Sequence, residues 1–230
     1  MSIYTIKKVP VNEVDKLVLF IDCHWKKDHA LVKSRALLDF QHLNKEEGCY
    51  NFIVAENNET KEYDALVGFI STAQYDKKLI ENGDYWGAIW KFREDVTNCE
   101  ISNAAFYIWK RIFKQPYFQS YAAIGISEVA KRIYEVSRIP IASLNQYYIA
   151  NETVDNFKIG ANLIKGNTNA CSSHISHIKS IDINQIEEGD VKAVYKPIKS
   201  VEYIKNRYSK HPTYKYMFWG IYSETLNSIF

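Results

Sequence analysis

Several absences in this chain of 230 residues narrow the kinds of protein that it can be. Near the N-terminus the longest apolar run is Leu17–Ile21, which is too short for a signal peptide or a bilayer span. No C-x-x-C pair occurs among the four cysteines, Cys23, Cys49, Cys99 and Cys171. That spacing argues against a structural zinc site and fits reduced thiols, so we expect a cytoplasmic protein without a membrane span.

Strong charge of one sign is also missing. The formal net charge is +2, and no fold motif accompanies the few basic clusters, so we expect no nucleic-acid partner. Neither a G-x-x-x-x-G-K-[ST] phosphate loop nor a G-x-S-x-G nucleophile motif is present. Apolar residues make up 47% of the chain, which is enough to bury a core. The 17 tyrosines, 11 phenylalanines and 5 tryptophans fit a core, and they also suit a sugar or nucleotide pocket.

Hydrophobic periodicity predicts a first half with a strand, two helices and a hairpin. The strand is Ser2–Val9, a helix follows with Asn12 as its N-cap, and a second helix spans Leu31–Leu43. The hairpin joins Asn51–Glu56 to Asp64–Ser71 through a polar turn at Asn57-Asn58. Gly68 inside the second of these strands predicts a bulge or a close approach of the backbone.

The stretch Tyr85–Tyr148 carries the most information about function. The predicted order is strand, loop, helix, short strand, helix and strand, at Tyr85–Arg93, Asp95–Asn103, Ala104–Phe113, Ala122–Ile126, Glu128–Val136 and Ala142–Ile149. Alternation along the first of these strands places Trp86, Trp90 and Phe92 on one face.

The periodicity weakens after Ile149. Residues 151–199 are expected to form a connecting segment, and residues 200–230 a helix and strand hairpin. Ser200 caps the predicted helix Val201–Tyr208, and Tyr214–Tyr222 is strand-like. Either this hairpin packs back on the first domain, residues 1–150, or it begins a second, similar domain of a longer protein.

The segment AIGISEVAKRIYEVSRIPIASLNQYY, residues 123–148, resembles the strand–helix–strand end of the GNAT acyltransferase superfamily. Ala130 matches the small residue of that family's motif, and Tyr134 matches its tyrosine. The runs HWKKDHALVKSRALLDFQH, YNFIVAEN, LVGFIST and YWGAIWKFRED look like transferases of bacterial surface-polysaccharide gene clusters for O-antigen or capsule. The resemblance implies an α+β fold, in which helices flank a mixed, mostly antiparallel central sheet.

The resemblance also implies an activity, the transfer of an acyl group from acetyl-CoA or another acyl-CoA to an amine. The coenzyme would lie between Tyr85–Arg93 and Ala122–Ile126, with Tyr134 protonating the departing thiolate and Glu94 or Asp95 accepting a proton. The acceptor would be a small molecule, an amino sugar that a nucleotide could carry. The residues implied in coenzyme binding are Trp90, Lys91, Phe92, Arg93, Asn98, Ser102 and Asn103.

One departure from the family opens an alternative. The loop Asp95–Asn103 contains no glycine, although the family uses glycine there to bring the backbone close to phosphate. Glu100 adds a negative charge where the pyrophosphate would lie, while asparagine can partly replace glycine. The fold could therefore persist as a catalytically degenerate domain that binds a sugar or a partner chain.

Acceptor recognition is predicted at the break after the first helix, by His24, Trp25 and His29. Trp86 on the strand Tyr85–Arg93 is predicted to join them. A solvated polar turn is the plainer interpretation of the first three. The run Cys171, His174, His177 has metal-like spacing but no fourth ligand, and we expect no metal. The sequence leaves the oligomeric state open.

Overall fold

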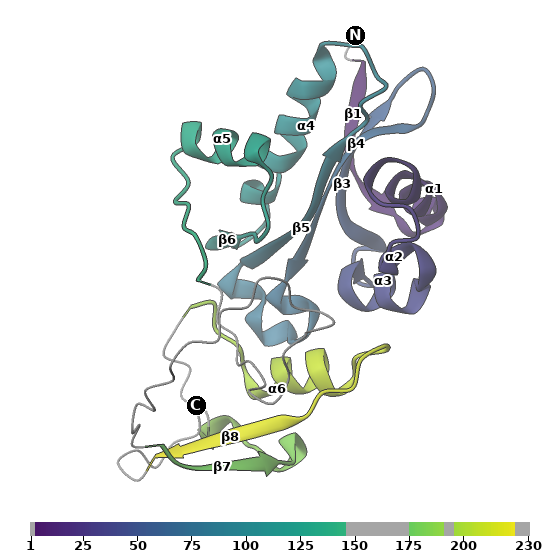
Figure 1. Ribbon diagram of the computed structural model, residues 1–230. Helices are drawn as coiled ribbons and strands as arrows, with labels where there is room; N and C mark the ends of the chain where they lie inside the picture. Colours follow the sequence, from purple (N-terminus) through teal and green to yellow (C-terminus); the bar gives the residue numbers. More distant parts are fainter. Residues whose placement is uncertain (1–2, 146–174, 191–195, 224–230) are drawn as a thin grey trace, which may run out of the picture.

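The computed structural model describes residues 3–145, 175–190 and 196–223 (Figure 1). Its main sheet has the order β1-β3-β4-β5-β6, with a short β2 paired to β3. The strands are β1 (Tyr4–Pro10), β2 (Leu43–Asn44), β3 (Cys49–Asn57), β4 (Tyr63–Ser71), β5 (Asp84–Phe92) and β6 (Ser120–Ala122). All neighbours are antiparallel except β5 and β6, which run parallel. The predicted mixed, mostly antiparallel sheet is confirmed.

Helices cover both faces of this sheet (Figure 1). One face carries η1 (Val11–Glu13), α1 (Val14–Phe20), η2 (Ile21–Trp25), α2 (Ala30–Lys33) and α3 (Arg35–His42). The other face carries α4 (Glu100–Lys110), η5 (Ile112–Lys114) and α5 (Glu128–Val136). Each face has its own apolar cluster, so β3, β4 and β5 are buried between two layers of helices. No helix among the described residues is both long and apolar enough to cross a membrane.

The helices before β3 differ from the prediction in their boundaries. Asn12 lies within the 3-10 turn η1 and does not cap α1. The predicted helix Leu31–Leu43 is interrupted at Ser34, whose backbone is extended and whose Oγ accepts a hydrogen bond from the Leu37 N–H at 3.2 Å. A serine side chain competes for backbone N–H groups in this way, so it ends one helix and begins the next.

The hairpin of β3 and β4 is confirmed, including its turn and its glycine. Asn57 Oδ1 accepts hydrogen bonds from the N–H groups of Glu59 and Thr60, which holds the turn. A Cβ added at Gly68 would overlap the Phe52 ring, so the backbone of β4 approaches that ring closely, as predicted.

Strand β5 contains a bulge that the alternation of its residues did not predict. From Val67 to Phe69, β4 advances by two residues, whereas β5 advances by three between Gly87 and Trp90. The extra residue reverses the alternation, because each strand residue points to the opposite face from its neighbour. Trp90 and Phe92 therefore share a face with Tyr85, and the prediction that Trp86 lies on the same face as these two is wrong.

The segments after β5 also differ from the expected boundaries. Helix α4 begins at Glu100, four residues before the predicted start, because Asn98 Oδ1 accepts the Glu100 N–H at 2.9 Å and nucleates the first turn. Strand β6 is only Ser120–Ala122, so the predicted strand Ala122–Ile126 is misplaced. Residues 142–145 are in no strand, and the rest of the predicted strand Ala142–Ile149 lies outside the described residues.

The C-terminal elements form a second, smaller layer below the main sheet (Figure 1). Strands β7 (Ile175–Ile181) and β8 (Phe218–Ser223) pair antiparallel, and η6 (Ile183–Gln185) and η7 (Glu188–Asp190) follow β7. Ser200 caps α6 (Val201–Ile204) as predicted, and η8 (Lys205–Ser209) extends it.

This C-terminal helix packs on the first sheet through η3 (Thr72–Gln74) and η4 (Lys77–Asn82). Tyr203 joins an apolar cluster with Ile70 and Tyr75, and Asn206 donates to the Tyr75 carbonyl at 2.6 Å. Residues 200–210 thus pack against the main domain and form part of its surface. The predicted division at residues 150 and 199 remains a prediction, because the described residues do not follow the chain from 146 to 174.

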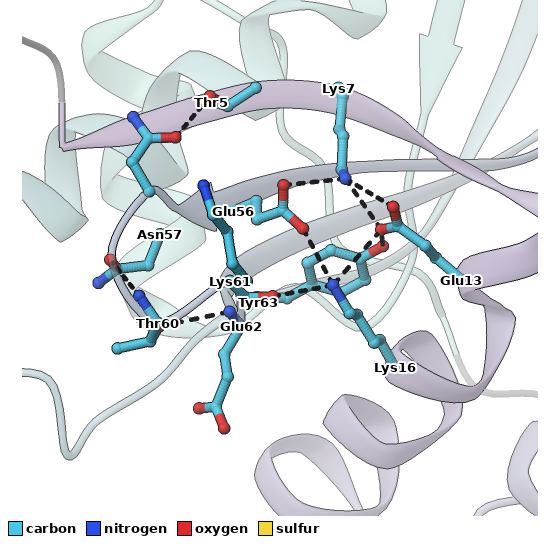
Figure 2. Close-up of polar contacts among 11 residues, drawn as sticks. Thr5, Lys7, Glu13, Lys16, Glu56, Asn57, Thr60, Lys61, Glu62 and Tyr63 are labelled. Atoms are coloured by element: carbon cyan, nitrogen blue, oxygen red, sulfur yellow. Dashed lines mark hydrogen bonds and ion pairs between the residues drawn. The ribbon is translucent and has the colours of Figure 1, made fainter.

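A cluster of paired charges joins β1, α1 and the β3–β4 hairpin (Figure 2). Lys7 Nζ lies 2.9 Å from both Glu13 Oε2 and Glu56 Oε2, and Lys16 Nζ lies 3.2 Å from Glu56 Oε1. Tyr63 donates its hydroxyl to Glu13 Oε2 at 2.5 Å. Two lysines and two carboxylates neutralise one another, so the cluster holds α1 against the sheet and offers no net charge to a ligand.

Candidate functional site

The described sheet opens between β5 and β6. The two strands pair at three positions, Asp84 with Ser120, Tyr85 with Tyr121 and Trp86 with Ala122. Strand β6 then ends, whereas β5 continues to Phe92. Among the described residues, the β6 side of Gly87–Phe92 therefore has no neighbouring strand. The bulge that β5 forms against β4 lies at the same place, just beyond the last pair with β6.

Aromatic side chains line this split. Trp109 of α4 stacks on Trp90 of β5 with ring centroids 5.2 Å apart, and on Tyr134 of α5 at 5.3 Å. Both pairs are within 16° of parallel. The Trp90 indole N–H donates to the Ala105 carbonyl at 3.0 Å, which fixes the end of the stack. Tyr121 of β6 meets the Tyr134 ring edge-on at 6.4 Å. Three separate elements thus hold Tyr134 in place.

The Tyr121 side chain lies inside the split. Its hydroxyl is 3.1 Å from the Tyr134 hydroxyl, and a Cβ added at Gly87 would overlap it. Only a glycine lets the Tyr121 ring approach β5 so closely. The separation of the two strands is therefore filled at its narrow end by an aromatic ring.

Both hydroxyls in the split are proton donors at neutral pH. Burial raises the pKa of Tyr134, whereas the neighbouring Tyr121 hydroxyl and Trp109 indole act to lower it. Burial and the nearby Tyr134 hydroxyl raise the pKa of Tyr121 well above its usual value. Protonated tyrosines suit the role of a general acid and not that of a base.

The end of β5 is dominated by ion pairs. Arg93 Nη2 lies 2.8 Å from Asp95 Oδ2, and its Nη1 lies 2.6 Å from Glu62 Oε2 and 3.5 Å from Asp64 Oδ1. The hydrogen bonds from Arg93 lower the pKa of Asp95 to about 2. Three carboxylates therefore already surround the predicted phosphate contact Arg93.

Glu94 and Lys91, predicted as base and coenzyme contact, bind each other. The hydrogen bond from Lys91 lowers the pKa of the exposed Glu94 carboxyl, which weakens it as a proton acceptor. Phe92 is packed in the apolar cluster under α4, together with Trp90. Asn98 uses its side-chain oxygen to begin α4, and Ser102 and Asn103 lie exposed on the first turn of that helix.

The predicted acceptor residues come from three elements: His24 and Trp25 are neighbours in η2, His29 is the N-cap of α2, and Trp86 is in β5. His24 packs on Phe20 at 5.1 Å and is close enough to Asp95 to lower its pKa, so it stands at the end of β5. His29 Nδ1 accepts the Leu31 N–H at 3.3 Å, and burial and the charge of Lys26 lower its pKa. Trp25 and Trp86 are each 44% exposed. Of these residues, His24 has an interaction that places it beside the predicted catalytic strand end.

A cavity of about 510 Å³ lies at the other end of β4 and β5. It is bounded by α3, β2, η3, η4 and η8, and its polar lining includes Asn51, Gln74, Asp39, Glu46, Glu47, Lys8, Lys45, Lys77, Asn206 and Lys210. Phe40, Tyr75 and Tyr85 supply aromatic walls. Tyr85 is also the residue of β5 that pairs with Tyr121, so the cavity wall adjoins the base of the split.

No group of three histidine, cysteine or acidic side chains that could hold a metal occurs among the described residues. Cys171 and His174 lie outside those residues, and His177 is in β7 with its side chain not described. The thiols of Cys23, Cys49 and Cys99 are unpaired with one another.

Tyr121, Trp109 and Gly87 are the residues of the split that the sequence analysis did not select. A glycine inside a strand is a signal for close approach of another group, and Gly87 carried that signal as Gly68 did. The tyrosine and the tryptophan have no such mark, since a chain with this many aromatic residues offers many equivalent candidates.

No protein-family model and no curated protein matches this chain. Solved structures do show likenesses. A mosquito arylalkylamine N-acetyltransferase like 5b aligns with a TM-score of 0.45 and 12% identity, over 61% of this chain and 84% of its own. A ribosomal-protein-alanine N-acetyltransferase from Brucella melitensis gives a TM-score of 0.43 and 11% identity, over 65% and 100% of the two chains. A protein from Clostridium difficile described as a possible acetyltransferase gives a TM-score of 0.42 and 17% identity, over 65% and 99% of the two chains. A proposed activity therefore has to stand on this chain's own residues.

Proposed function

We propose that this chain is an N-acyltransferase of the GNAT type that takes its acyl group from acyl-coenzyme A. The observation that carries the proposal is the split between two parallel strands, with the buried Tyr134 beside it. The backbone of Gly87–Phe92 on the β6 side has no strand neighbour among the described residues. A pantetheine arm contains two amides and can hydrogen-bond to such an edge as an added strand would.

The chemistry assigned to the split is acyl transfer to an amine. The amine attacks the thioester carbonyl, the carbon–sulfur bond breaks, and Tyr134 supplies a proton to the sulfur. A tyrosine whose pKa is raised by burial is protonated at neutral pH, which this role requires. Glu94 is the carboxylate that the resemblance offers as base, although its ion pair with Lys91 favours water as the proton acceptor.

The cavity beside Tyr85 supports an amino sugar as acceptor. Glu46 and Glu47 pair with Lys77 and Lys8, so Asp39 is the carboxylate of the lining that suits an ammonium group. The amide side chains and aromatic walls suit a hydroxylated ring. The rim lysines Lys45 and Lys210 suit the phosphates of a nucleotide carrier. Such an acceptor agrees with the resemblance to transferases of surface-polysaccharide gene clusters.

A second candidate is a catalytically degenerate domain that binds a sugar or a partner chain. Two observations favour it. The Tyr121 ring fills the narrow end of the split, and three carboxylates surround Arg93 at the place where the coenzyme's phosphates would lie. Negative charge at that strand end opposes a pyrophosphate.

Acetyl-coenzyme A distinguishes the two candidates. At a ligand concentration about 100 times its Kd, binding to the folded state raises the stability by about 2.7 kcal/mol, which a thermal-shift assay detects. An acyltransferase also releases free thiol when supplied with glucosamine or a nucleotide-linked amino sugar. Tyr134→Phe should keep the thermal shift and lose most of the thiol release, whereas Tyr107→Phe, on the exposed side of α4, should change neither.

The proposal fails if millimolar acetyl-coenzyme A leaves the melting temperature unchanged, and the degenerate domain then becomes the better description. If Tyr134→Phe keeps full turnover, the coenzyme site stands and the tyrosine has no part in the reaction.

A further inference from the structure

We propose that Tyr121 and Trp109 complete, with Tyr134, a three-donor site that holds the thiolate sulfur of coenzyme A. The inference deepens the proposed function and rests on it, since the ligand is the product of the acyl transfer. It assigns a role to two residues that the resemblance to the acyltransferases does not single out.

Three hydrogen-bond donors meet beside β5 in this split. Tyr121 and Tyr134 each contribute a hydroxyl hydrogen and Trp109 contributes its indole N–H, yet these three donors share a single hydrogen bond of 3.1 Å. The Trp109 side chain is 1% exposed, and its nitrogen has no hydrogen-bond partner among the described residues. A buried polar group without a partner is rare in native structures and indicates a missing ligand, water or strain.

The three donors lie close to one another and to the backbone of β5. The indole N–H of Trp109 faces both tyrosine hydroxyls closely enough to lower the pKa of each. The hydroxyl of Tyr121 lies against the backbone of Gly87, the first residue of β5 beyond the pairing with β6. Gly87 is partly exposed and Ala88 is exposed, so solvent reaches the stretch of β5 beside the donors.

The chemistry of the three donors favours a ligand atom with negative charge. Besides burial, the groups that shift the pKa of each tyrosine hydroxyl are the other hydroxyl and the Trp109 indole. No lysine, arginine or carboxylate among the described residues of β5, β6, α4 and α5 shifts either pKa. Donors without a nearby anion favour an atom that carries negative charge. A sulfur that leaves a thioester with its electron pair is such an atom.

These groups account for the bonds, the electron pair and the protons of the step. As the carbon–nitrogen bond forms and the carbon–sulfur bond breaks, the electron pair moves to the sulfur. Tyr121 and Trp109 donate hydrogen bonds to the sulfur, and Tyr134 gives it a proton. The Tyr134 oxygen then regains a proton from Tyr121 or solvent, and the amine loses its proton to water. Tyr121 is thus a positioning residue with direct contact to the leaving group.

The test compares two ligands that differ at the sulfur. Coenzyme A has an ionisable thiol and acetyl-coenzyme A has none, so their affinities measured by calorimetry from about pH 6.5 to about pH 9 report a preference for the thiolate. In the unmodified protein we expect the affinity for coenzyme A, relative to that for acetyl-coenzyme A, to gain at least tenfold as the pH rises across this range. In Tyr121→Phe we expect the gain to fall by about tenfold, since one charge-assisted hydrogen bond is lost.

Two further variants control for folding and for the loss of a tyrosine. Trp109→Phe keeps an aromatic ring in the stack and removes only the N–H donor, and it should reduce the gain in the same direction. Tyr107→Phe removes an exposed hydroxyl from the same helix and should leave the gain unchanged. Melting temperatures identify a variant that does not fold, in which case the other variant decides.

The outcomes separate this inference from the proposed function. If both ligands bind and their affinity ratio is the same at every pH, or changes equally in the unmodified protein and Tyr121→Phe, the three-donor site is refuted and the coenzyme site stands. If neither ligand binds at millimolar concentration, the proposed function fails and the donor site with it.

Discussion

The buried ring of His42 makes the stability of this protein depend on pH in a way that can be calculated. His42 is 0% exposed at the end of α3 and packs on Phe52, with ring centroids 4.5 Å apart. Its Nδ1 lies 3.1 Å from the Phe69 carbonyl oxygen, and its Nε2 has no partner among the described residues. Burial lowers the pKa of His42 from 6.5 to about 4, against the weaker effect of that hydrogen bond.

The sign follows from which state binds the proton. Above about pH 6.5 the ring is neutral in both states, and the histidine makes no difference to the free energy of unfolding. Between about pH 6.5 and pH 4 the unfolded chain takes up a proton that the folded protein excludes. The free energy of unfolding therefore decreases as the pH is lowered through this range. A shift of about 2.5 pKa units at about 1.36 kcal/mol each amounts to roughly 3 kcal/mol lost by pH 4.

Urea unfolding at several pH values between 7 and 4 measures this loss in the unmodified protein and in His42→Asn. Asparagine can still donate to the Phe69 carbonyl but has no group that titrates in this range. We expect the unmodified protein to lose about 3 kcal/mol more than the variant between pH 7 and pH 4. Carboxylates titrate in both proteins, and their effect cancels in the difference.

Leu38→Ala is the matched control, because Leu38 is also 0% exposed on α3 and carries no titratable group. This substitution should lower the free energy of unfolding by about 2–5 kcal/mol at every pH. Its plot of unfolding free energy against pH should run parallel to that of the unmodified protein. If the His42→Asn curve is also parallel, the ring is either charged in the folded state or reached by water, and the reasoning is refuted.

Two further substitutions test the fold. Gly83 has a φ of 51°, and a Cβ there would overlap the Tyr117 carbonyl, so Gly83→Ala should destabilise by about 3 kcal/mol or more in denaturant unfolding. Gly48 has a φ of 62° with open space around it, so Gly48→Ala should cost only about 1 kcal/mol, and equal costs would contradict the overlap. Glu13 accepts hydrogen bonds from Tyr63 and Lys7, which outweigh burial and lower its pKa. Glu13→Gln should therefore cost about 1–2 kcal/mol at pH 7 and less as the pH falls below about 4.5, and a cost that does not change with pH would show that the carboxylate charge is not used.

Local chemistry made the hairpin and the Ser200 cap predictable, although the cap predicted at Asn12 was wrong. The polar turn at Asn57, the close approach at Gly68 and the cap at Ser200 each depend on a few neighbouring residues, and the structure contains all three. Short-range hydrogen bonds and backbone dihedrals decide such features, so they can be read from a short window of sequence.

The candidate site depended on contacts between distant segments. Tyr134 was selected from a resemblance, but its partners Tyr121 and Trp109 come from β6 and α4, which meet only when the sheet has formed. The bulge in β5 likewise arises from pairing with β4, and it moved Trp86 to the face opposite Trp90. A periodic pattern assumes an unbroken strand, so one inserted residue reverses every side chain beyond it.

By itself, the sequence indicated most of the helices, strands and turns, because apolar periodicity and turn residues act over a few positions, and its resemblance to a known superfamily indicated the mixed sheet that they form. Only the tertiary structure decided that the pairing of β5 with β6 ends at Trp86, that Tyr121 lies against Gly87, and that Trp109 is buried beside Tyr134. These features arise where strand pairing ends and three elements pack together, and no local pattern of residues specifies that arrangement.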